Sequence, residues 1–164
     1  MSHSQFTPGE RFATMIDWAP SEADGIWWHL GWKRVLLEPG FVKLEWEPSS
    51  NHSFPAGGGW IVHGGMVTAL LDTAMGSATW TLLNDHEVFL TADLRTEFYR
   101  PTVPGRVTAE GRVIHKTRRV TFASAELFDA KGKLLASCRG TNLTIDVTSP
   151  EDQSKKGPTS PSRG

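Results

Sequence analysis

The shortages in this sequence exclude several classes of protein. Its 164 residues contain one cysteine, Cys138, so an intrachain disulfide framework and a cysteine-rich metal site are both excluded. No stretch is long and apolar enough to cross a membrane, and the polar residues 1–14 lack the apolar run of a signal peptide. We therefore expect a cytoplasmic protein without metal or cofactor, in which Cys138 is a small core residue of a strand.

Net charge is also nearly absent. The 17 basic and 18 acidic residues leave a formal net charge of −1, so no overall field attracts nucleic acid or an anionic membrane. The N-terminal residues 1–32 hold four acidic residues and one arginine, which argues against a nucleic-acid-binding arm. We expect neither nucleic acid nor a membrane as partner, and an anionic ligand would need a local basic cluster.

The chain divides into three segments by composition. Residues 1–32 form an irregular arm rich in tryptophan, in which short helices are possible near Pro8 to Ile16 and from Ser21 onward. Residues 33–147 carry the periodic apolar patterns of a folded domain. Residues 148–164 are rich in Ser, Pro, Gly and Lys, and we predict that they are a disordered tail.

The domain pattern predicts two strands, a long helix and four further strands. Alternation is clearest in Phe41 to Glu47, and the helix runs from Gly64 to Leu83. A loop is expected over Pro48 to Gly59. The other predicted strands are Lys33 to Glu38, Val88 to Tyr99, Arg106 to Lys116, Arg119 to Phe128 and Lys133 to Ile145. This order implies an α+β fold in which an antiparallel sheet wraps around one long central helix.

The predicted helix carries one charged residue, Asp72. A solvated helix face would carry several, so most of its circumference should be covered. One face is a core stripe of Val67, Leu70, Leu71, Ala74 and Ala78. The opposite face is small and would allow close approach by a helix, a second subunit or a ligand; it holds Gly65, Thr68, Ala69, Asp72, Gly76 and Thr79. Asp72 is then either a functional carboxylate or a structural one bonded to a neighbouring hydroxyl such as Thr68.

Two glycines open this helix after His63. Gly64 and Gly65 expose the first backbone N–H groups where the helix dipole is positive, which suits a developing oxyanion. The alternative is an ordinary glycine-rich turn with a structural His63.

The segment from His63 to Asp72, HGGMVTALLD, resembles the signature of the hotdog-fold acyl-CoA thioesterases of the phenylacetyl-CoA type (PaaI-like). The similarity continues through Thr91-Ala92-Asp93-Leu94, Tyr99-Arg100-Pro101 and Gly105, and covers roughly residues 35–145. The resemblance implies a hotdog fold and hydrolysis of an acyl-CoA to free acid and CoA. It implies that Asp72 is the general base or the nucleophile, that the Gly64 N–H polarises the thioester carbonyl, and that Thr91 orients the attacking water. With His63, these are the candidate catalytic residues.

The sequence departs from that family at two positions. Six residues before the histidine the family often has Asn or Gln, and here it is Gly57; four residues after the acid some members have Thr, and here it is Gly76. Asn51 or His52 could supply the missing polar group from the same loop. Candidate substrate-binding residues are therefore Gly65 and Asn51, together with a basic cluster at a turn that could hold coenzyme A or simply be solvated: Lys116, Arg118 and Arg119.

The expected site needs two chains. Gly64 and Asp72 are eight residues apart, about 12 Å along a helix, whereas one thioester carbon must lie about 3 Å from both groups. We therefore expect a homodimer or a dimer of dimers with a shared site. The alternative function is a non-catalytic acyl-CoA binding or sensing protein on the same fold. A hotdog hydratase is disfavoured because no histidine follows Asp72 until His86, and a DNA-binding regulator is disfavoured by the acidic arm.

Overall fold

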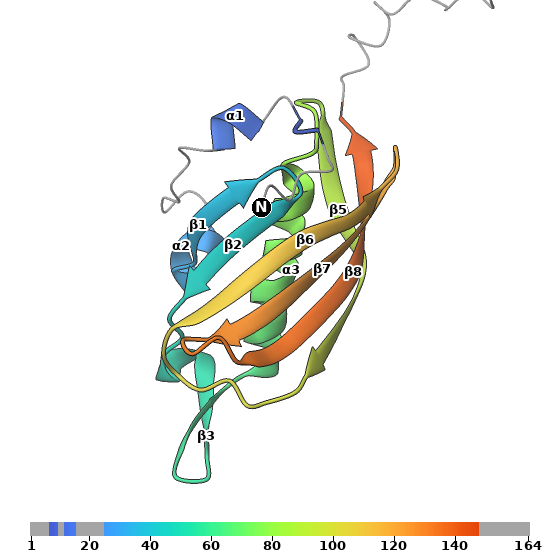
Figure 1. The fold of residues 1–164 in the computed structure, drawn as a ribbon. Helices are drawn as coiled ribbons and strands as arrows, with labels where there is room; N and C mark the ends of the chain where they lie inside the picture. The colour runs from blue at the N-terminus through green and yellow to red at the C-terminus, as the bar shows by residue number, and fades with distance from the viewer. Residues whose placement is uncertain (1–6, 10–11, 16–24, 148–164) are drawn as a thin grey trace, which may run out of the picture.

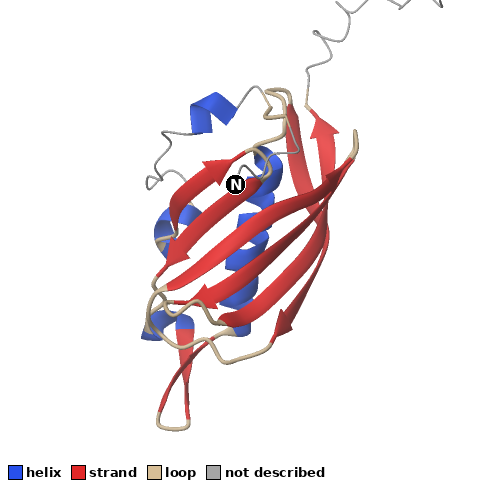
Figure 2. Ribbon diagram, viewed as in Figure 1, coloured by secondary structure: helices blue, strands red, loops and turns tan. Residues whose placement is uncertain are grey.

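The computed structural model describes residues 7–9, 12–15 and 25–147. Its main feature is a six-stranded antiparallel sheet that curves around one helix, α3 (Gly64–Trp80) (Figures 1 and 2). The strand order is β1-β2-β6-β7-β8-β5. The strands are β1 (Lys33–Glu38), β2 (Phe41–Trp46), β5 (Glu87–Phe98), β6 (Val107–Lys116), β7 (Val120–Asp129) and β8 (Leu134–Asp146). The predicted α+β arrangement, a sheet wrapped around a central helix, is confirmed.

The core lies between the concave face of the sheet and α3. In β2, Val42, Leu44 and Trp46 alternate with the half-buried Lys43 and Glu45, as the period-two pattern predicts. The predicted core stripe of α3 is fully buried, and so are the inward residues of the sheet, which include Val107, Ala109, Ala123, Ala125, Leu127 and Cys138. The prediction that Cys138 is a core residue of a strand is confirmed.

Helix α3 ends at Trp80, three residues before the predicted end. The Thr81 hydroxyl accepts the Gly40 N–H at 2.7 Å and donates to the Ala78 carbonyl at 2.6 Å. The Thr81 carbonyl accepts the N–H of Gly9 at 2.8 Å. Other segments therefore use the polar groups of Thr81, and the apolar residues that follow it are buried without being helical.

The segment predicted as a loop over Pro48 to Gly59 contains regular structure, and that prediction is wrong. It forms a short 3-10 helix, η2 (Ser50–His52), and the first strand of a hairpin, β3 (Ser53–Ala56) with β4 (Gly59–Val62). The turn residues Gly57 and Gly58 have φ of 57° and 82°, which glycine adopts without strain. The hairpin projects from the end of the molecule at which α3 begins (Figure 1).

The N-terminal arm is described only in part. It contains α1 (Phe12–Met15), within the predicted range, and α2 (Ile26–Leu30). The expected helix start at Ser21 lies outside the described residues. Trp27 packs edge-to-face on the buried Trp32, with ring centroids 5.9 Å apart. The predicted tail, 148–164, also lies outside the described residues. No described helix has the length and apolar character that a membrane span requires.

Candidate functional site

Asp72 is a half-buried residue of α3 that faces the edge strand β5. Its Oδ1 accepts a hydrogen bond of 3.0 Å from the Thr91 hydroxyl. Thr68, the neighbour that a purely structural aspartate was expected to use, instead donates to Thr96 at 3.2 Å. The carboxylate is thus held by a strand residue 19 positions away, and no other described residue donates to it.

The interface between α3 and β5 has an aromatic ring on either side of the Thr91 and Thr96 hydroxyl groups. The Phe98 ring lies at the start of the helix, where a Cβ on Gly64 would be 3.2 Å from its Cζ. The Phe89 ring lies one turn beyond Asp72, where a Cβ on Gly76 would be 2.6 Å from its Cζ. The small face of α3 is therefore partly covered within the chain, since Asn142 also donates to the buried Thr79 at 2.8 Å.

The start of α3 leaves one backbone donor free. His63 caps the helix: its Nδ1 accepts the Gly65 N–H at 3.0 Å, and its carbonyl accepts those of Met66 and Val67. Among the described residues, no acceptor pairs with the N–H of Gly64. Because Nδ1 is an acceptor, a neutral His63 ring carries its proton on Nε2. Gly65, predicted to bind substrate, has its N–H engaged within the helix start and offers only its exposed backbone surface.

The loop before the hairpin is tied to this helix start. The His52 carbonyl accepts the N–H of His63 at 2.9 Å, and the His52 ring accepts the N–H of Ser49 at 3.0 Å through Nδ1. Asn51 is exposed, and its backbone N–H donates to the Ser49 hydroxyl at 3.3 Å. Of the two polar side chains expected to replace the family amide, His52 is thus engaged in a cap and Asn51 faces solvent.

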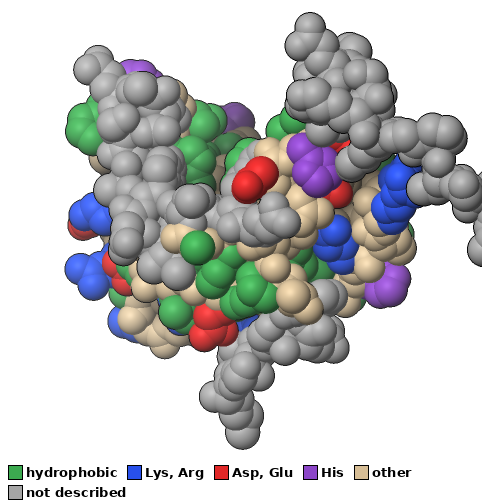
Figure 3. Space-filling view, turned by 90° about the horizontal axis from the view of Figure 1, so that it is seen from above, with side chains coloured by type: hydrophobic (Ala, Val, Ile, Leu, Met, Phe, Trp, Pro, Cys, Tyr) green, Lys and Arg blue, Asp and Glu red, His purple; other side chains and the backbone are tan. Residues whose placement is uncertain are grey.

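The predicted basic cluster lies at the other end of the helix. Lys116 is half-buried, and Arg118 and Arg119 are exposed in the turn between β6 and β7. The Arg119 carbonyl accepts the N–H of Thr144, and Thr144 pairs with Phe89, which covers Gly76. The turn thus lies near the level of Gly76, which is twelve residues after Gly64, or about 18 Å along the helix axis. Seen from that end, basic side chains stand among other types rather than in one continuous patch (Figure 3).

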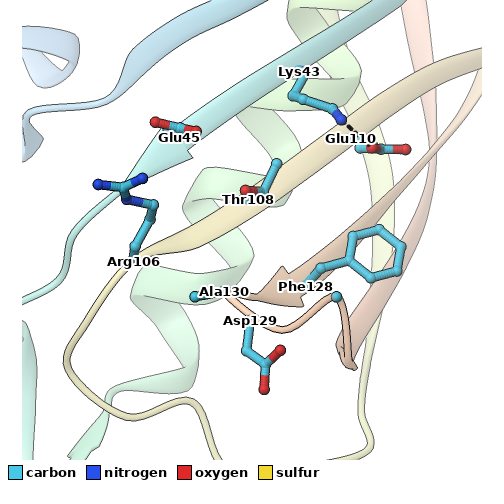
Figure 4. A pocket seen from close by; sticks show the side chains of 9 residues that line it. Lys43, Glu45, Arg106, Thr108, Glu110, Phe128, Asp129 and Ala130 are labelled. Atoms are coloured by element: carbon cyan, nitrogen blue, oxygen red, sulfur yellow. Dashed lines mark ion pairs between the residues drawn. The ribbon is translucent and has the colours of Figure 1, made fainter.

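A separate hollow of about 490 Å³ lies on the outer face of the sheet. It contains charges of both signs, and two of them form an ion pair, Lys43 to Glu110 at 2.8 Å (Figure 4). Arg112 also contacts Glu110, at 3.1 Å. The sheet separates this hollow from α3, so it is not part of the carboxylate site. Within the part of the chain that the structure describes, no three His, Cys, Asp or Glu side chains gather as a metal would require.

Comparison with known proteins places these residues in a family. The sequence model of the thioesterase superfamily matches residues 59–136. A protein of Saccharolobus solfataricus that is provisionally named an esterase is 33% identical over 120 residues, which are 73% of this chain and 83% of that protein. The chain belongs to the thioesterase superfamily. The proofreading thioesterase EntH of Klebsiella pneumoniae is 28% identical over 111 residues, 68% of this chain and 79% of EntH.

A solved structure supports the fold of this thioesterase-superfamily chain. The PaaI protein of E. coli, from the phenylacetic acid degradation operon, matches with a TM-score of 0.68 and 23% identity, covering 76% of this chain and 86% of PaaI. At that identity the likeness concerns the fold. The predicted hotdog fold is confirmed.

Sequence reasoning missed the aromatic contacts of β5. The strand has a bulge between Thr91 and Asp93, after which the alternation of inward residues shifts by one. As a result Phe89 and Thr91 before the bulge and Thr96 and Phe98 after it all meet α3. The repeated pairing of Phe with Thr at both ends of the strand was the signal available in the sequence.

Proposed function

We propose that this thioesterase-superfamily protein hydrolyses the thioester bond of an acyl-coenzyme A, with Asp72 as the catalytic carboxylate. The observation that carries the proposal is the pairing of Asp72 with the Thr91 hydroxyl on a helix that has no other charge. The unpaired N–H of Gly64 supports it, because a backbone donor at a helix start can stabilise the thioester oxygen as it becomes negative.

Two reaction courses use these groups. In the first, Asp72 takes a proton from water while the water oxygen attacks the carbonyl carbon; the carbon–sulfur bond then breaks, and the thiolate of coenzyme A leaves and is protonated. In the second, the Asp72 carboxylate itself attacks the carbonyl carbon, the carbon–sulfur bond breaks, and the thiolate of coenzyme A leaves and is protonated; water then hydrolyses the resulting anhydride to the free acid and regenerates Asp72. Thr91 holds one carboxylate oxygen in both courses, and His63 positions Gly64 by capping the helix.

The site is completed by a second copy of the chain. Gly64 and Asp72 lie about 12 Å apart along α3, too far to serve one carbon. One edge of β5 pairs with β8, and the other edge has no partner strand in the described residues. Antiparallel pairing of two such edges, with Phe98 of one opposite the partner's Thr91, brings Gly64 of one chain level with the partner's Asp72.

The same pairing gives the basic turn a role. Lys116, Arg118 and Arg119 lie at the far end of α3 from Gly64, so they come near the partner's Gly64 in the antiparallel pair. We propose that they bind the phosphates of coenzyme A. Replacing all three with alanine should raise KM for an acyl-CoA about tenfold or more, with little change for the N-acetylcysteamine thioester of the same acid, which lacks phosphates. Equal changes for both esters would contradict this role.

The direct experiment measures free thiol released from a panel of acyl-CoAs. The single cysteine of the chain is buried, which keeps the thiol background low. Asp72→Ala should lower kcat by about 10²–10⁴-fold while the protein stays folded. Glu126→Ala, an exposed carboxylate on the outer sheet face, is the matched control and should leave kcat unchanged. Tight acyl-CoA binding by a wild-type protein that releases no thiol would instead establish the non-catalytic binding function.

Subunit complementation tests the shared site. Asp72→Ala and Gly64→Trp should each be inactive, the second because a bulky side chain blocks the helix start against Phe98. Mixed dimers then contain one site with both lesions and one with neither, and recover up to about half of the activity of a wild-type dimer. Inactivity after demonstrated subunit exchange, with each variant still dimeric, would place both groups in one chain.

A further inference from the structure

The β3–β4 hairpin has two different faces. Its antiparallel register pairs Phe54 with Ile61 and Pro55 with Trp60, so the first pair points to one side and the second pair to the other. Phe54 and Trp60 are about equally exposed, at 45% and 46%. Large exposed aromatic side chains on a projecting hairpin indicate a contact surface rather than a core.

The Phe54 side of the hairpin borders a cavity. This cavity measures about 320 Å³ and lies at the start of α3. The hairpin contributes Phe54 and Ile61, the helix contributes Gly64 and Val67, and the end of β5 with the loop after it contributes Phe98 and Arg100, among others. Trp60 does not line it, although it stands on the same hairpin.

Two aromatic rings flank the peptide that carries the free N–H. Phe98 approaches Gly64, where a Cβ would be 3.2 Å from its Cζ, and the Phe54 ring stands edge-on to His63 with centroids 6.5 Å apart. A thioester carbonyl oxygen at the Gly64 N–H therefore has its carbon at the mouth of this cavity. One substituent of that carbon is sulfur, which leads to coenzyme A, and the other is the acyl chain.

The residues that line the cavity determine which chemical groups can bind in it. It is mainly apolar, no acidic side chain contributes to it, and its one charged residue, Arg100, donates to the Leu134 carbonyl at 2.6 Å. The volume is at the small end for ligand sites. An apolar acyl group of moderate size fits this lining, whereas the amide- and hydroxyl-bearing arm of coenzyme A would find few polar partners there.

We propose that this cavity binds the acyl group, and that Phe54 and Phe98 determine a preference for single-ring or medium-length apolar acyl groups. The inference rests on the proposed thioesterase function. It assigns acyl recognition to the hairpin, with the Phe54 face as the wall that the substrate contacts.

The test compares phenylacetyl-CoA and hexanoyl-CoA with acetyl-CoA, whose single methyl group offers little apolar surface to the hairpin. Phe54→Ala should lower kcat/KM for the two larger substrates about tenfold, from the lost apolar contact, and change acetyl-CoA less than about twofold. Trp60→Ala, equally exposed on the opposite face, is the matched control and should change none of the three. Ile61→Trp, which fills the cavity, should exclude the larger acyl groups while retaining acetyl-CoA.

The outcomes separate this inference from the proposed function. Equal loss for all three substrates in Phe54→Ala would show that the cavity holds the coenzyme A arm, and would overturn the inference while hydrolysis stands. The same result in Trp60→Ala as in Phe54→Ala would overturn it as well. If wild-type protein releases no thiol, the proposed function fails. The cavity can then be tested by calorimetry: Phe54→Ala should weaken the binding of phenylacetyl-CoA and leave the binding of free coenzyme A unchanged.

Discussion

Adding one methyl group at Gly76 should destabilise the protein, although alanine is the better helix former. The new Cβ would lie 2.6 Å and 3.0 Å from two ring atoms of Phe89. That ring cannot move away freely, because Trp80 packs edge-to-face against it with centroids 5.9 Å apart. Overpacking of this kind costs about 1–3 kcal/mol, whereas alanine gains about 1 kcal/mol over glycine within a helix. The net expectation is a loss of about 1 kcal/mol, or a Tm lower by about 2–4 °C.

The sign of the effect should reverse when the ring is removed. In a Phe89→Leu background the clashing ring atoms are absent, so Gly76→Ala should raise stability by about 1 kcal/mol through helix propensity alone. Urea unfolding of the four proteins at one fixed protein concentration measures both changes, and their difference should be about 1–3 kcal/mol. A Gly76→Ala protein that is more stable than wild type, or that changes equally in both backgrounds, would refute the packing argument.

Three further outcomes can be measured on the same protein. Thr91→Val should lower kcat about 10- to 100-fold with KM nearly unchanged, and Thr91→Ser should restore most of it. Burial raises the pKa of Glu110, but the hydrogen bonds and charges of Lys43 and Arg112 outweigh it and lower the pKa below its usual value. Glu110→Gln should therefore cost about 0.5–1 kcal/mol in urea unfolding at neutral pH, and the difference should vanish as pH falls through that lowered pKa. Burial raises the pKa of the Cys138 thiol, so a disulfide reagent should label it slowly until urea unfolds the chain.

The strands of the main sheet and the central helix could be predicted because their patterns report burial on one face. Each predicted strand of that sheet agrees with an observed one to within a residue or two at its ends. The β3–β4 hairpin could not be found this way, since of its eight strand residues only Val62 is buried. Its signal was local instead: Gly57-Gly58 is a dipeptide that permits the positive φ angles of a tight hairpin turn.

The residues that α3 contributes to the candidate site could be predicted from the sequence pattern, whereas those that β5 contributes could not. Asp72 stands out as the one charge on an apolar helix, and the two glycines mark the helix start. Thr91 came only from the family resemblance, and simple alternation would put Thr91 and Thr96, five residues apart, on opposite faces of the strand. The bulge between Thr91 and Asp93 cancels that difference, so both hydroxyls reach α3. A sequence pattern read with strict period two has no means of placing a bulge.

The two departures from the family pattern have local structural causes. Gly57 stands at the tip of the hairpin with φ of 57°, and no described side chain lies within 4 Å of where its Cβ would be, so this position is solvent-facing. The Phe89 ring fills the space beside Gly76, so the side chain of a threonine at that position would collide with the ring and could not assist Asp72. Neither position can then supply a polar partner to the carboxylate, and Thr91 is the one described donor that remains. This chain should therefore depend on its Thr91 hydroxyl more strongly than relatives that retain a threonine one turn after the acid.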